Sequence, residues 1–113
     1  MIRLTLLNGK HWYVNPDHIV GIKSGHKYGA AIESDHQTGI EHTIDVTQVQ
    51  ESPEEVARKV LEWKLAMERY RAVVFAEAKE TGEEAKMLAW ARDVEYRIML
   101  NLAGLEEPQN AHQ

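Results

Sequence analysis

The predicted second helix, residues 82–103, carries the polar side chains best suited to holding a ligand: Trp90, Arg92, Asp93, Tyr96 and Arg97. Residues three or four positions apart lie on one side of a helix, which groups Trp90, Asp93 and Arg97 and makes Tyr96 a neighbour of Arg92. An aromatic ring can stack on a base, and a guanidinium can form paired hydrogen bonds with a phosphate. This chemistry suits a small anionic nucleotide. The alternative is an aromatic interface residue surrounded by solvated ion pairs.

The charge of the chain limits which anions it can hold. With 13 Lys and Arg against 18 Asp and Glu, the net charge is −5. This balance argues against binding of the DNA or RNA phosphate backbone over a large surface. A small anion can be bound only where several arginines converge. The first predicted helix supplies two further arginines. The predicted ligand-binding residues are therefore Arg92, Arg97, Trp90, Tyr96, Arg58 and Arg69.

The histidines and serines do not form a recognisable catalytic or metal-binding motif. Five of the six histidines lie in the first half, at irregular spacing: His11, His18, His26, His36 and His42. Metal sites on one element need close pairs, and there is no cysteine or E-x-x-H pattern. No serine lies in a G-x-S-x-G elbow, and Ser52 suits a helix cap. We predict no catalytic residue, no metal, no cofactor and no enzymatic activity.

Length and composition favour one compact domain over residues 1–113. A hydrophobic content of 43% supports a real core, and the absence of cysteine excludes disulfides. No apolar run in the sequence is long enough to span a bilayer. We expect a cytoplasmic protein without a membrane partner.

Residues 1–50 predict a small antiparallel sheet of about five strands. Ile2, Leu4 and Leu6 alternate with polar residues, as in a strand with one buried face. A three-residue turn over Leu7–Gly9, with Gly9 in the left-handed conformation, would place Leu4 opposite Trp12 and Ile2 opposite Val14. A two-residue turn would instead place Trp12 opposite Thr5, and we favour the longer turn.

The last predicted strand also alternates. Ile40, His42, Ile44 and Val46 form its predicted inner face, with Glu41, Thr43 and Asp45 on a polar outer face.

Residues 52–80 predict a long helix that opens with an S-x-x-E capping box at Ser52 and Glu55. Two apolar stripes follow, so more than one side of this helix must be covered. The first stripe comprises Val56, Val60, Trp63, Met67, Tyr70 and Val74, and the second comprises Ala57, Leu61, Leu65, Ala72 and Ala76.

Residues 82–103 predict a second helix, which completes a helical hairpin. Thr81 and Glu84 form a second potential capping box, and Gly104 suits a helix end. The inner stripe is predicted to be Met87, Ala91, Val94, Ile98 and Leu102. Residues 104–113 predict a polar tail. The expected fold is α+β, with the sheet followed by a long two-helix hairpin.

The long helix is also expected to mediate self-association. At ~1.5 Å per residue it is longer than a sheet of fifty residues can cover. We therefore predict a homo-oligomer, a dimer or higher, held by the second helix and by Tyr70, Val74 and Phe75.

Two segments resemble a known family: MIRLTLLNGKHWYVNPDHIVGI and ESPEEVARKVLEWK, within residues 1–64. They are similar to the flagellar and swarming-motility family FlbD, or SwrD. The matching positions are Leu6, Asn8, Gly9, Val14, Asn15, Ile19, Val20, Ile22, Ser52, Glu54, Glu55 and Val56. The resemblance implies a motility accessory that acts through protein–protein contacts.

The layout of the whole chain, a small sheet before a long helical pair, resembles that of phage anti-defence sponges of the anti-Thoeris type. Those proteins oligomerise and sequester cyclic nucleotide signals of the ADP-ribose type. This resemblance implies a phage or prophage protein that captures a small nucleotide, and it is the leading hypothesis from the sequence.

Overall fold

A computed structural model describes residues 1–105, apart from the side chains of residues 37 and 38. In chain order the elements are β1 (Ile2–Thr5), β2 (His11–Val14), the 3-10 turn η1 (Pro16–His18), β3 (Ile19–Ser24), β4 (Ala30–Thr38), β5 (Glu41–Val49), α1 (Pro53–Glu77) and α2 (Gly82–Leu102). The chain divides into two compact units, Met1–Leu61 and Glu62–Gln113, and α1 contributes to both. Most of the predicted tail, residues 106–113, lies outside the described residues.

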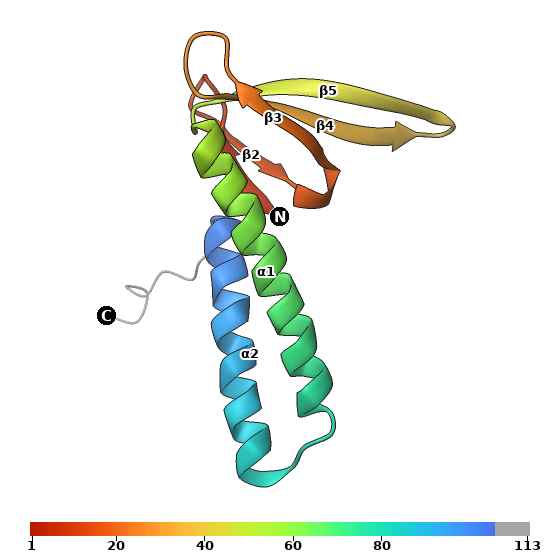
Figure 1. The fold of residues 1–113 in the computed structure, drawn as a ribbon, viewed down its shortest axis with the longest axis vertical. Coiled ribbons are helices and arrows are strands. Elements are labelled where there is room, and N and C mark those ends of the chain that lie inside the picture. The colour runs from red at the N-terminus through yellow and green to blue at the C-terminus, as the bar shows by residue number, and fades with distance from the viewer. Residues whose placement is uncertain (106–113) are drawn as a thin grey trace. The chain divides into compact units, whose positions relative to one another are not determined.

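The fold is α+β with two helices, as predicted, but its five strands do not form one sheet. β1 and β2 form a two-stranded antiparallel sheet, and β3, β4 and β5 form a three-stranded one in that order. Figure 1 shows β4 and β5 as a long hairpin beside β3. The expectation of a single five-stranded sheet is therefore wrong.

The side chain of Glu51 explains why pairing between the two sheets stops. An isolated bridge joins Leu6 to Val49, and the Gln50 N–H donates to the Thr5 carbonyl over 2.7 Å. The Thr5 N–H, however, donates to Glu51 Oε1 at 2.9 Å, and the Thr5 hydroxyl donates to Oε2 at 3.0 Å. A carboxylate thus replaces the backbone partner that would continue the ladder between β1 and β5.

The register of the first hairpin is the predicted one. Leu4 pairs with Trp12 and Ile2 with Val14, and the Leu6 N–H donates to the Lys10 carbonyl at 2.8 Å. Gly9 has a φ of 87°, in the left-handed region that a side chain disfavours. The three-residue turn is therefore confirmed.

The core of the first unit collects apolar residues from the strands and from the start of α1. The largest fully buried apolar side chains are Ile2, Leu4, Ile32, Val49 and Val56. Because these residues come from β1, β4, β5 and α1, the two sheets share one core.

The predicted inner face of β5 is wrong. Val49 pairs with Ala30, and Thr47 pairs with Ile32. The side chains of Ala30 and Ile32 are both buried. Since side chains alternate along a strand, Ile44 and Val46 must face the other way, and both are exposed. The apolar alternation in this strand therefore marks an outer face.

The predictions for the helix ends are confirmed only in part. Ser52 caps α1, because its hydroxyl accepts from the Glu55 N–H at 3.1 Å. Thr81 precedes α2 but makes no side-chain cap, so the second capping box is wrong. At the far end Gly104 has a φ of 69°, and the Leu105 N–H donates to the Leu100 carbonyl at 2.8 Å, which confirms the glycine as a helix end.

Neither described helix has the properties of a membrane-spanning helix. Across residues 1–105, no helical segment combines the length and the apolar character that crossing a bilayer requires.

Replacing Glu51 should destabilise the first unit. Glu51→Ala leaves the Thr5 N–H and hydroxyl without their acceptor, and Lys59 Nζ without a carboxylate 3.9 Å away. We expect the free energy of unfolding, measured by urea denaturation, to fall by about 1–3 kcal/mol. Glu68→Ala, at an exposed position in α1, is the control and should change it by less than about 0.5 kcal/mol. Equal effects of the two substitutions would contradict this role of Glu51.

Candidate functional site

An open groove runs between the second half of α1 and α2, which lie side by side (Figure 1). Its volume is about 320 Å³, at the low end of the range for small-molecule pockets. The lining residues are Glu62, Leu65, Ala66 and Arg69 from α1, and Glu95, Ile98, Asn101 and Leu102 from α2. We call this surface the hairpin groove. It mixes apolar side chains with a few charged ones.

Glu95 is the unusual residue of the hairpin groove. Its side chain is only 13% exposed, and Arg69 Nη1 lies 3.9 Å from Oε1, too far for a hydrogen bond. Oε2 is buried and accepts no hydrogen bond from any described residue. A buried carboxylate oxygen without a donor costs free energy, so Glu95 is a destabilising feature of the packing between α1 and α2.

Arg92 already has a carboxylate partner. Its Nη1 atom donates to both oxygens of Glu77, over 2.7 and 2.9 Å. The pair joins α2 to the end of α1 and is partly shielded, since the two side chains are 36% and 23% exposed. Arg92 thus holds the hairpin together, and an anionic ligand would have to compete with Glu77 for it.

The two predicted aromatic residues occupy different surroundings. Trp90 is 71% exposed, in an apolar patch with Met87, Leu88 and Ala91. Tyr96 packs against Tyr70 of α1, with ring centroids 6.2 Å apart. Trp90 is therefore free to meet a partner, whereas Tyr96 already contributes to the contact between the helices.

The five predicted ligand-binding residues that belong to the second unit do not line one pocket. Arg69 lines the hairpin groove, while Trp90 lies in the apolar patch on α2. Arg97 is exposed and forms no ion pair with the described residues. Arg58 is exposed on α1 in the first unit, whereas the other five residues belong to the second unit. Within the second unit, Arg69 lies near Glu95 whereas Arg92 is bound by Glu77, so these two arginines do not converge.

The stripe predicted as the inner face of α2 is not its buried face. Met87 is 70% exposed and Val94 is also exposed, whereas Met99 and Ala103 are buried. The Arg92–Glu77 contact agrees with this orientation, because the side of α2 that bears Arg92 and Met99 is turned toward α1. Within the predicted stripe, Met87 and Val94 are thus exposed to solvent, whereas Ala91, Ile98 and Leu102 are partly buried.

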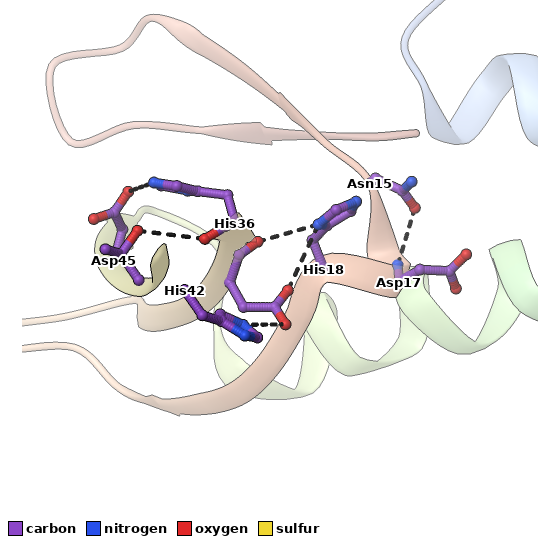
Figure 2. A network of polar contacts seen from close by, with 8 residues as sticks. Asn15, Asp17, His18, His36, His42 and Asp45 are labelled. Carbon is purple, nitrogen blue, oxygen red and sulfur yellow. Dashed lines mark hydrogen bonds and ion pairs between the residues drawn. The ribbon is translucent and has the colours of Figure 1, made fainter. Parts of the chain in front are cut away.

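A second cluster, which the sequence analysis missed, lies in the first unit (Figure 2). Asp35 Oδ2 is 3.1 Å from His42 Nε2, and Oδ1 is 3.6 Å from His18 Nδ1. His18 Nδ1 is also 3.1 Å from the Asp35 carbonyl oxygen, and His36 Nε2 lies 3.2 Å from Asp45 Oδ2. Three of the six histidines are thus placed by carboxylates.

The pairing of β4 with β5 creates the Asp35–His42 and His36–Asp45 contacts, whereas His18 comes from η1. Asp35 pairs with Ile44 and His36 with Thr43, so the diagonal neighbours His42 and Asp45 come within reach. Knowledge of the register between the two strands would have predicted these two contacts, whereas the spacing of residues along one strand does not. The described residues contain no group of three potential ligands positioned to hold a metal ion.

Comparison of the chain with protein-family models, with curated proteins and with solved structures gives no match in any of the three. The resemblances to FlbD and to anti-defence sponges therefore stay predictions. The function must be argued from the surfaces themselves.

The Arg92–Glu77 pair should stabilise the hairpin measurably. A double-mutant cycle with Arg92→Ala and Glu77→Ala, followed by urea denaturation, should give a coupling free energy of about 1 kcal/mol, because the pair is partly shielded from water. The same cycle on Lys86 and Glu83, which are highly exposed, is the control and should give less than about 0.5 kcal/mol. Indistinguishable coupling energies would contradict a stabilising role for Arg92.

Proposed function

We propose that this protein is a non-enzymatic binding protein that works as a homo-oligomer and acts through protein–protein contacts of its helical hairpin. The observation that carries the proposal is the apolar surface left exposed on the second unit. Within the second unit each helix packs against one other helix, and exposed apolar side chains on its remaining faces favour a partner that covers them.

The exposed apolar side chains lie on both helices. The larger ones are Leu65, Val74 and Phe75 on α1, and Met87, Trp90 and Val94 on α2. Burying one such side chain contributes about 2 kcal/mol. A few of them together therefore favour association strongly enough to offset its entropic cost.

Capture of a small anionic nucleotide is the second candidate. Arg97 favours it, since this guanidinium is exposed and unpaired among the described residues, two helical turns from the exposed Trp90. Against it, Arg92 is engaged by Glu77, and Arg69 faces a groove that also contains Glu62 and Glu95. The geometry therefore supports protein contacts better than it supports nucleotide capture.

Self-association is directly measurable. Multi-angle light scattering of the unmodified protein should give the mass of at least two chains at high micromolar concentration, because burial of the hairpin's apolar surface drives assembly. The mass of a single chain at that concentration would contradict the proposal.

Calorimetry separates the two candidates. Titration with cyclic ADP-ribose isomers and cyclic dinucleotides should give only heats of dilution if protein contacts are the whole function. If nucleotides are captured, binding heats appear, and Arg97→Ala weakens binding by about 1.5–3 kcal/mol, the contribution of a charge-assisted hydrogen bond. Arg71→Ala, at an exposed position outside the groove, is the matched control and should leave any binding unchanged.

A further inference from the structure

We infer that a pocket between β2 and the β4–β5 hairpin binds a primary ammonium group carried on a short alkyl chain. The pocket has a volume of about 340 Å³, and all of its lining residues belong to the first unit. We call it the sheet pocket. The inference is independent of the proposed self-association, which concerns the helices of the second unit. The residues that carry it are Trp12, Ser34, His36, Asp45 and Thr47.

The inner face of the β4–β5 hairpin changes from apolar to polar where it reaches the sheet pocket. Ile32 on β4 and Val49 on β5 are fully buried. Since side chains alternate along a strand, the next two inward positions on each strand continue the same face. These positions are Ser34 and His36 on β4, and Thr47 and Asp45 on β5, and all four line the pocket. Polar side chains at inward positions are typical of a binding pocket.

Ser34 is the decisive residue of the sheet pocket. Its side chain is only 8% exposed, and its hydroxyl forms no hydrogen bond with any described residue. A buried hydroxyl without a partner costs free energy. Unlike Glu95 Oε2, the Ser34 oxygen is not sealed inside the protein, because Ser34 lines the open pocket. A ligand in the pocket can therefore reach this oxygen and satisfy it.

The register of the hairpin groups three hydrogen-bond acceptors. Ser34 pairs directly with Asp45, and Thr47 lies two residues further along the same face. His36 Nε2 lies 3.2 Å from Asp45 Oδ2 (Figure 2), which leaves Oδ1 available to accept a hydrogen bond. Two hydroxyl oxygens and one carboxylate oxygen match the three N–H donors of a primary ammonium group.

The charge of the sheet pocket favours a cation. No lysine or arginine lines it, and Asp45 supplies a carboxylate. The other lining carboxylate belongs to Asp35 and is already in contact with His42 and His18. Trp12 pairs with the buried Leu4, so its ring lies on the inward side of β2. An indole ring suits contact with an alkyl chain or with the ammonium itself.

Other ligands fit the sheet pocket less well. An anion would meet the Asp45 carboxylate without a lysine or arginine to offset it. The described residues contain no group of three side chains that could hold a metal ion. A guanidinium binds best to both oxygens of one carboxylate, whereas one oxygen of Asp45 faces His36.

NMR titration of the isotope-labelled protein tests the site. Butylammonium chloride is the probe, and 1-butanol is the neutral control of nearly equal size. Butylammonium should shift the amide signals of Ser34, Asp45 and Thr47 and the indole N–H signal of Trp12, whereas 1-butanol should not. Equal shifts with the two probes, or no saturable shifts with butylammonium at high millimolar concentration, would overturn the inference.

A charge-matched pair of variants separates the site from general attraction to an acidic chain. Asp45→Asn keeps the shape of the side chain but removes its charge, and it should raise the Kd for butylammonium at least about tenfold. Asp17→Asn makes the same change of charge at an exposed position of η1 outside the pocket, and it should leave the Kd within about threefold. Equal effects of the two substitutions would contradict a built site.

Ser34→Ala removes one acceptor. It should raise the Kd for butylammonium about threefold or more, and the urea midpoint should not fall, because the hydroxyl has no partner within the described chain. An unchanged Kd together with a lower urea midpoint would assign the hydroxyl to the fold and overturn its role in binding.

Two sources carry a primary ammonium on an alkyl chain: a free small amine and a lysine side chain of a partner protein. Nα-acetyl-lysine methylamide distinguishes them. Binding tighter than that of butylammonium would assign the pocket to a lysine side chain, and equal or weaker binding would assign it to a free amine. Failure of both probes would overturn this inference and leave the proposed self-association unaffected. A monomeric protein that binds butylammonium would overturn the proposed function alone.

Discussion

The Arg92–Glu77 ion pair joins α2 to the end of α1, and it marks which side of α2 faces its neighbour. Because Arg92 and Met99 turn toward α1, the stripe containing Val94 and Ile98 faces outward or into the open groove. Exposure of apolar side chains such as Met87 and Val94 is costly in water. The orientation that satisfies the charge of Arg92 therefore leaves apolar surface available for a partner.

The same interactions account for the weakness of the nucleotide hypothesis. Guanidinium groups bind phosphate well when they are preorganised and free, but Arg92 is held by Glu77 and Arg69 lies near Glu95. In a chain of net charge −5, basic groups tend to find carboxylates within the protein. Arg97 is the exception among the predicted arginines of the second unit, and one exposed guanidinium provides less than the convergent set that a multiply charged nucleotide requires.

Local signals in the sequence predicted local structure well. The turn at Gly9, the Leu4–Trp12 register, the Ser52 cap and the helix end at Gly104 all depend on a few neighbouring residues, and all are present. The errors concern pairings between distant segments. The sheet is divided because Glu51 takes the Thr5 N–H, forty-six residues away in the chain, and the histidine contacts depend on the β4–β5 register. The stripe on α2 was recognised as apolar, but the exposure of Met87 and Val94 was not predicted, because periodicity alone does not show which side of a helix faces its neighbour.

The central claim, that a second copy covers the exposed apolar surface of the hairpin, is tested most directly by NMR on a mixture of isotope-labelled and unlabelled protein. Isotope-filtered spectra report only contacts between different chains. The proposed self-association predicts intermolecular contacts to the exposed apolar side chains of the hairpin, such as Val74, Phe75 and Val94. Intermolecular contacts confined to the exposed face of β5, or no intermolecular contacts at high micromolar concentration, would contradict it.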